Sequence, residues 1–159
     1  MANNVRKEII NSVKTALEGI TTANSYQHEV KSVNLQLVPY ENVTINSSPC
    51  LCIVDAGDTL IDEVKQDAAA YVRANMNLII VGIIKVTEDL SDTFNEHQTD
   101  LRTCIFNMSL DDPGGTPSIN VRHQRVPQGT APDVEEIESN GLIYTTFLEI
   151  GYHYEKGDS

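Results

Sequence analysis

An ordered run of amphipathic segments in the second half of the chain constrains the fold most. Apolar residues recur with helical spacing from Leu90 to Met108, and a turn signal follows at Gly114–Gly115. Two segments with strand character come next, Ile119–Val126 and Leu142–Tyr154. Because none of these segments has the pattern of a catalytic centre, the run predicts scaffold that ends in a strand able to pair with a neighbouring chain.

The N-terminal segment predicts a second amphipathic helix. This helix would begin after a cap at Asn3 or Asn4, reach about Leu17 and end at Gly19. Its apolar residues recur with helical spacing and share one face: Val5, Ile9, Val13, Ala16 and Leu17.

The segment Glu29–Val38 alternates between polar and apolar residues. Val33, Leu35 and Leu37 would point to one side, which predicts a half-buried strand. The following residues, Pro39–Pro49, have the composition of a turn-rich connection.

Two further segments between the helices have strand character. Cys50–Asp55 is short and almost wholly apolar, so we expect a central strand covered on both faces, which Ala56-Gly57-Asp58 ends. Asp67–Val86 is rich in β-branched residues and predicts one long or bent strand. Gly82 within it marks a bend or a bulge.

The C-terminal half completes the expected order of elements. Ser91 or Asp92 would open the helix, and His97 would lie at the boundary of its apolar stripe. Pro127–Gly141 is expected to form a long acidic hairpin loop. The last strand places its apolar residues on one face, interrupted by Thr146: Leu142, Tyr144, Leu148, Ile150, Tyr152 and Tyr154.

This order, α-β-β-β-α-β-β, predicts an α+β fold. Two helices would pack on one face of a mixed, mainly antiparallel β-sheet. The chain has 159 residues, of which 40% are hydrophobic, so we expect a single domain over residues 1–159.

Charge and cysteine content narrow the classes of function. The chain has 23 acidic and 11 basic residues, and its formal charge of −12 disfavours nucleic-acid binding by phosphate neutralisation. An acidic wall would instead repel a DNA backbone and let it slide past. Three cysteines, an odd number, predict reduced thiols in a cytosolic compartment, and neither a signal peptide nor a membrane span is expected.

The candidate chemical groups do not form a known catalytic or metal-binding motif. Cys50 and Cys52 stand alone as a CxC pair, so buried apolar cysteines are favoured over a metal site, and no cofactor is predicted. Acidic residues gather after the short strand, at Asp55, Asp58, Asp62, Glu63 and Asp67. A solvated loop is the favoured interpretation of this acidic stretch, with a partner-facing surface or a divalent-cation site as the alternatives.

A basic pair and a second acidic stretch are candidates for a contact between subunits. Arg122 and Arg125 would pair with the acidic loop of a neighbouring copy, or else be solvated strand residues. The acidic loop includes Asp133, Glu135 and Glu136. Long strands with unpaired edges also invite the addition of a strand from another chain.

The layout resembles that of the tail terminator proteins of long-tailed bacteriophages, also called tail completion or minor tail protein U-like proteins. The resemblance covers nearly the whole chain and is one of layout. Four features carry it: the opening helix with the strand Val33–Leu37, the apolar segment Leu51–Val54 ending in the acidic turn Asp55–Asp58, the helix end Asp100–Ile105 before Gly114–Gly115, and the closing strand Phe147–Tyr154. The long stretches Pro39–Pro49 and Pro127–Gly141 depart from that layout.

The resemblance implies a structural virion protein of the phage tail and neck, assembled in the host cytoplasm, rather than an enzyme. It implies a hexameric ring on the head-proximal end of the tail tube that stops tube growth and presents a surface to the head–tail connector or stopper protein. DNA would pass through the ring without specific binding. Two alternatives stay open: another neck component, or a small binding or hydrolytic domain that uses the carboxylates of Asp55–Asp67 with a divalent cation.

Overall fold

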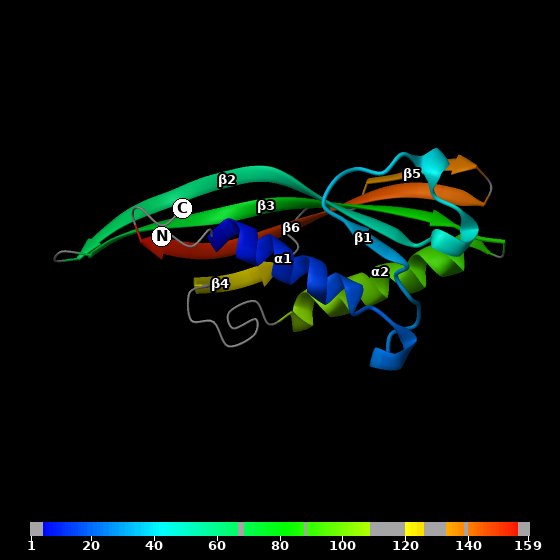
Figure 1. Ribbon diagram of the computed structural model, residues 1–159, viewed down its shortest axis with the longest axis horizontal. Coiled ribbons are helices and arrows are strands. Elements are labelled where there is room, and N and C mark those ends of the chain that lie inside the picture. Colours follow the sequence, from blue (N-terminus) through cyan, green and yellow to red (C-terminus); the bar gives the residue numbers. More distant parts are fainter. Residues whose placement is uncertain are drawn as a thin grey trace.

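The computed structural model (Figure 1) describes residues 5–66, 69–87, 89–108, 120–125, 133–138 and 140–155. Side chains are described within these ranges except at residues 5, 60–72, 120–125, 133 and 153–155. The α-helices are α1 (Val5–Glu18) and α2 (Leu90–Asn107), and short 3-10 helices are η1 (Thr22–Asn24), η2 (Tyr40–Asn42) and η3 (Ile45–Ser47). The strands are β1 (Ser32–Asn34), β2 (Cys50–Gln66), β3 (Ala69–Lys85), β4 (Asn120–Arg125), β5 (Asp133–Glu138) and β6 (Gly141–Glu155).

The strands form one six-stranded sheet with the order β1-β2-β3-β6-β4, and β5 also pairs with β6. The pair β1–β2 is parallel and the other pairs are antiparallel. Figure 1 shows β2, β3 and β6 running along the long axis of the molecule. This arrangement confirms the predicted α+β fold, with β5 as a strand that the sequence did not predict.

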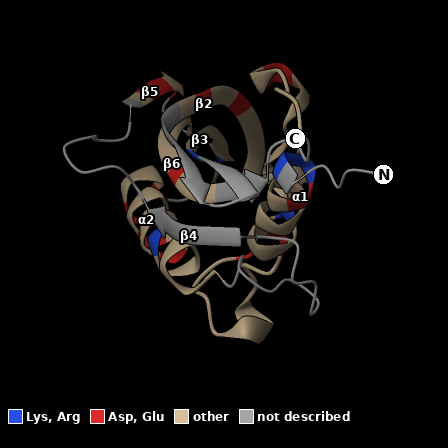
Figure 2. Ribbon diagram, turned by 90° about the vertical axis from the view of Figure 1, so that its left-hand side faces the viewer, with Lys and Arg blue, Asp and Glu red and all other residues tan. Residues whose placement is uncertain are grey.

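The core lies between the two helices and one face of the sheet. Ile9, Val13 and Leu17 of α1 are fully buried, as the helical spacing predicted. They belong to one apolar cluster with Leu101 and Ile105 of α2 and with alternate residues of the long strands. Figure 2, a view along the long axis, shows α1 and α2 on opposite sides of the molecule. The packing of both helices on one sheet face was correctly predicted.

The alternation along β6 was also correctly predicted where the side chains are described. Leu142, Tyr144, Thr146, Leu148, Ile150 and Tyr152 are all buried. Thr146 therefore belongs to the buried face rather than interrupting it. The predicted turn at Gly114–Gly115 and the caps at Asn3 or Asn4 lie outside the described residues.

The predicted strand Glu29–Val38 is wrong beyond its centre. Only Ser32–Asn34 forms a strand, and Leu35 and Leu37 are 48% and 62% exposed. The chain then leaves the edge of β2 because Val38 and Val43 pack with Cys50, Cys52 and Ile83 in a second apolar cluster on the other face of the sheet. The chain is therefore redirected by apolar packing on the opposite face of the sheet. The polar and apolar alternation within Glu29–Val38 contains no information about that packing.

Two predicted interruptions between strands are also wrong, one at Ala56-Gly57-Asp58 and one at Pro127–Gly141. Ala56-Gly57-Asp58 does not end β2, because the pairing with β3 continues after a register shift between Asp55 and Asp58. Gly57 absorbs this shift with a φ of +88°, a conformation that glycine adopts without strain. From Asp55 to Glu63 the acidic stretch is therefore strand rather than loop, and Asp67 lies outside the described residues. The predicted loop Pro127–Gly141 contains β5, which pairs with β6.

Gly82 is not a bulge. Its pairing with β2 and β6 continues without a register shift on either side. A Cβ atom at this position would collide with the ring of Tyr144, which is fully buried on β6. The glycine therefore makes room for a large aromatic side chain on the neighbouring strand.

We expect Gly82→Ala to lower the free energy of unfolding by about 1–3 kcal/mol, because the added methyl group overpacks the core against Tyr144. Urea denaturation measures the change. In the background of Tyr144→Ala the same substitution should cost much less, and an equal cost in both backgrounds would contradict the assigned role of Gly82.

Candidate interaction surfaces

A cluster of charged and polar groups joins the start of α1 to β2. The Arg6 guanidinium donates from Nη2 to Asp55 at 2.7 Å and from Nε to both oxygens of Asp58 at 3.1 Å. The Tyr152 hydroxyl on β6 also donates to Asp58. Arg6 of α1 thus bridges the carboxylates of Asp55 and Asp58 on β2, and the Tyr152 hydroxyl joins β6 to the same cluster.

The bulge in β2 explains why two aspartates three positions apart meet one arginine. In a regular strand such residues point to opposite faces. Asp55 is registered with Leu78 and, after the bulge, Asp58 is registered with Met76. Since Leu78 and Met76 both lie in the core under the helices, Asp55 and Asp58 share the helix-facing side of the sheet.

The environment of Asp55 favours the charged form of its carboxyl group. Partial burial raises the pKa of Asp55, but hydrogen bonds from Arg6 and the Gly57 backbone N–H outweigh it and hold that pKa below the ordinary value of 3.8. For Arg6, partial burial opposes the charge, and the two aspartates raise its pKa above the ordinary value. The arginine and the two carboxylates therefore stabilise one another's charged forms.

The remaining acidic candidates on β2 lie further along the strand. Asp62 is registered with Arg73 and Glu63 with Val72 on β3. Within the residues whose side chains are described, no group of three or more His, Cys, Asp or Glu side chains is placed to hold a metal ion. The buried thiols of Cys50, Cys52 and Cys104 are free, in agreement with the prediction of buried reduced cysteines.

The two outer edges of the sheet differ in how they are covered by other strands. On one side, β1 covers only residues 50–52 of β2, so residues 53–66 have no strand partner there among the described residues. A groove of about 340 Å³ lies at the start of this edge, with Ile10, Leu35 and Ile53 among the side chains that line it. On the other side, the outer edge of β6 is paired with β5 over residues 141–145 and with β4 over residues 149–153.

The strand β5 presents an acidic surface. Glu135 and Glu136 are exposed, and the apolar side chains of Val134 and Ile137 are 48% and 41% exposed. The predicted acidic candidates Asp133, Glu135 and Glu136 therefore lie on one edge strand. Arg122 and Arg125 lie on β4, which pairs with the same edge of β6 as β5 does, so the basic and acidic candidates are neighbours along one edge.

Buried polar residues of α2 were missed by the sequence analysis. His97, predicted at a boundary, is fully buried, and its Nε2 shares a hydrogen bond with the Tyr144 hydroxyl. Asp100 is 3% exposed and accepts hydrogen bonds from the backbone N–H groups of Gln27 and His28 at 3.1 and 2.9 Å. Their position on the apolar face of α2 could have indicated their burial. A polar residue on such a face needs a hydrogen-bond partner.

Burial strongly favours the neutral form of His97. Desolvation and, to a smaller extent, the nearby charge of His28 lower the pKa of His97 to about 4, while Asp100 acts in the opposite direction. Phe94 packs edge-on against Tyr144, with a centroid distance of 5.5 Å. The contacts of His97 and Phe94 with Tyr144 fix α2 on β6 and are core contacts.

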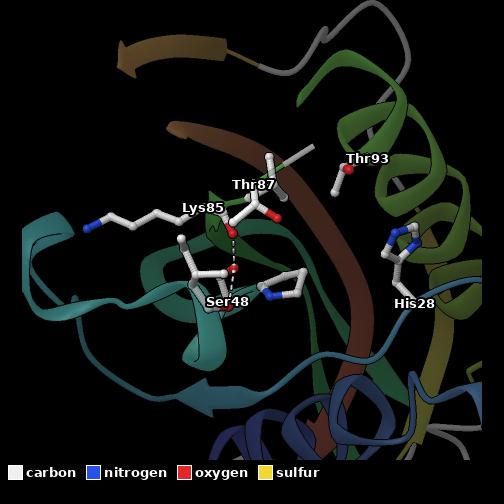
Figure 3. Close-up of a pocket in the computed structure, with 8 residues that line it drawn as sticks. His28, Ser48, Lys85, Thr87 and Thr93 are labelled. Carbon is white, nitrogen blue, oxygen red and sulfur yellow. Dashed lines mark hydrogen bonds between the residues drawn. The ribbon is translucent and has the colours of Figure 1, made fainter. Parts of the chain in front are cut away.

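A small cavity lies where the loop after β3 meets the start of α2 (Figure 3), with a volume of about 230 Å³. The Ser48 hydroxyl donates to the backbone carbonyl of Lys85 at 2.6 Å. Figure 3 shows His28 and Thr93 on the wall opposite Ser48, and the Lys85 ammonium pointing away. That ammonium lies 4.1 Å from the ring centroid of Tyr40. The Ser48 hydroxyl is thus engaged as a donor to the backbone, a structural arrangement rather than that of an activated nucleophile.

In comparisons with known proteins, no family model and no curated protein matches this chain. Within the described part of the chain, no helix is both long enough and apolar enough to cross a membrane. The surfaces are therefore interpreted from their own geometry and charge.

We expect the stability of the protein to fall as the pH drops from about 6.5 to about 4. The folded state holds His97 neutral to about pH 4, whereas the unfolded chain takes up the proton near pH 6.5. The stabilisation is present above pH 6.5, and about 3 kcal/mol is lost as the pH falls through this window. Urea denaturation of wild type and His97→Gln at several pH values measures it, and parallel pH profiles of the two proteins would contradict the assignment.

We expect Arg6→Met to raise the pKa of Asp55 towards its ordinary value, because the guanidinium that stabilises the carboxylate is lost. The free energy of unfolding should fall by about 1 kcal/mol above pH 4, since the pair is partly exposed. In wild type this contribution is lost as the pH drops through the lowered pKa of Asp55. Carboxyl NMR titration provides the measurement, with Lys7→Met as the matched control. An unchanged Asp55 titration would refute the bridge.

Proposed function

We propose that this chain is a tail terminator of a long-tailed bacteriophage. It would form a ring on the head-proximal end of the tail tube, end tube polymerisation, and present the joining surface for the head–tail connector protein. DNA would pass through the ring without specific binding. The observation that carries the proposal is a long sheet with two different sides. Residues 53–66 of β2 have no strand partner on one side among the described residues, and β4 and β5 form the other side.

Such a sheet suits assembly in a ring. A head-to-tail contact joins two different surfaces of the same subunit, and a series of such contacts closes when the rotation between copies allows it. The two sides of this sheet are different surfaces. Within the described ranges, β1 covers only residues 50–52 of β2 on one side, whereas the other side carries the two short strands β4 and β5. The α+β fold is compatible with the protomer that the resemblance implies.

The charge of the chain supports the same proposal. A formal charge of −12 gives a ring of several copies a strongly negative character. Around a DNA channel, negative charge repels the phosphate backbone and keeps the passing DNA from binding. The exposed carboxylates of β5 add an acidic surface for a partner, where charge pairs would govern specificity and association rate.

The proposal is tested by assembling phage particles without this chain. Electron microscopy should show tails of irregular, extended length that fail to join heads, because nothing ends tube growth. Supplying the wild-type chain should restore uniform tails and joining. If particles without the chain have tails of normal length that carry heads, the proposed function is wrong. Uniform tails that merely fail to join heads would identify a connector instead.

A further inference from the structure

A cavity of about 340 Å³ lies between α2 and β5, which are both on the left-hand side in Figure 2. It shares no lining residue with the groove beside β2 or with the cavity of Figure 3, so it is a separate site. Four residues of α2 line it, and their spacing of three and four positions places them on one flank of the helix: Asn95, Gln98, Thr99 and Arg102.

Phe94 and Val134 form the apolar part of the lining. Phe94 packs edge-on against Tyr144 of β6. Val134 is registered with Tyr144, and registered residues share a face of the sheet, so Val134 lies on the face that α2 covers. Val134 is nevertheless 48% exposed. An apolar side chain that enters the cavity can therefore contact both residues.

Gln98 contributes a buried amide whose hydrogen bonds are not made. The residue is 8% exposed, and its Nε2 and Oε1 atoms are both buried without a hydrogen-bond partner in the part of the chain that the structure describes. An unpaired buried amide is costly, and native structures rarely keep one without a reason. Since Gln98 lines the cavity, rotation of its side chain presents the amide to a ligand and breaks no hydrogen bond.

Arg102 contributes a positive charge. It is exposed, and it has no ion-pair or hydrogen-bond partner among the described residues. Within the described lining it is the one charged residue, in a chain whose formal charge is −12. A guanidinium group binds a carboxylate through two parallel N–H···O bonds, and a single arginine balances a single negative charge. The charge of the cavity therefore favours a carboxylate.

The donors and acceptors of the cavity narrow the ligand further. The N–H groups of Arg102 and of Gln98 Nε2 fit the two oxygens of a carboxylate, whereas Gln98 Oε1 accepts and fits an N–H group. The Thr99 hydroxyl is already used, since it donates to the backbone carbonyl of Asn95 at 3.0 Å. A carboxylate, an N–H group and an apolar side chain occur together in the last residue of a peptide chain. An internal aspartate or glutamate instead has its acid where the apolar side chain belongs.

We infer that this cavity binds the C-terminal residue of a partner protein, an apolar residue with a free carboxylate. Arg102 and the Nε2 group of Gln98 bind the carboxylate, and Gln98 Oε1 accepts from the backbone N–H of the same residue. Its side chain lies against Phe94 and Val134. Capture of a chain end by such donors is a recurring mode of peptide recognition. The inference goes beyond the proposed tail function and does not rest on it.

Fluorescence anisotropy with the full chain and matched peptides tests the site. Two tripeptides carry a dye at the N-terminus and end in leucine, one with a free carboxylate and one amidated. The peptide with the free carboxylate should bind with a dissociation constant of roughly 0.1–1 mM. The amidated peptide should bind at least about tenfold more weakly, because it has lost the charged acceptor. The same loss is expected for an amidated peptide that carries an internal glutamate.

Substitutions in the cavity test the assigned residues. Arg102→Met removes the guanidinium group and Gln98→Leu removes the amide, and each should weaken binding of the free-carboxylate peptide by about tenfold. Lys14→Met removes the same charge from α1, on the opposite side of the molecule in Figure 2, and should leave binding unchanged.

Urea denaturation separates a role of Gln98 in binding from a role in the fold. The Gln98 amide has no hydrogen-bond partner in the free protein, so Gln98→Leu should leave the urea midpoint unchanged or raise it. A lower midpoint would show that the amide supports the fold, and it would overturn the assignment of Gln98 to the ligand.

Selective binding of the free-carboxylate peptide, weakened in both cavity variants, supports the inference. Equal binding of the free and amidated peptides, no binding, or binding that both variants leave unchanged overturns it. A preference for the peptide with internal glutamate would assign an acidic side chain as the ligand and also overturn it. None of these outcomes bears on tail length or head joining, so the test of the proposed function is independent of this one.

Discussion

The pairing of β3 with β2 on one side and with β6 on the other is the constraint on which the rest of the structure depends. β3 has 17 residues and is registered with both neighbours along most of its length. This register decides which alternate residues face the helices. It thereby places Asp58 beside Arg6 and the Tyr144 ring over Gly82. It also leaves β2 and β4 as the opposite sides of one sheet.

The periodicity of apolar residues was sufficient to predict which face is buried in helices and strands that bury one face and expose the other. The faces of α1 and α2 and the alternation of β6 followed from spacing alone, because a single layer of core decides their burial. The α+β class followed from the same elements. Of the candidate interaction residues, the sequence indicated Asp55 and Asp58 as an acidic group, but it did not indicate Arg6, which is 49 to 52 positions away in the chain.

The errors arose where a second surface or a distant partner decides the outcome. Leu35 and Leu37 alternate like strand residues, yet packing on the opposite sheet face takes the chain away from β2. Gly57 was interpreted as the end of a strand, although a glycine with positive φ also permits a bulge that continues one. His97 was placed at a boundary because its partner, Tyr144, lies on a strand 47 positions further along.

These features together describe a core that holds one long sheet, in which residues 53–66 of β2 have no further strand partner on their outer side within the part of the chain that the structure describes. We propose that copies of this chain close into a ring. Native mass spectrometry of the purified chain over a concentration series, with and without the matching tail tube protein, tests that claim most directly. A closed hexameric species, alone or with the tube protein, is the predicted result. A monomer under both conditions at every concentration would contradict the account.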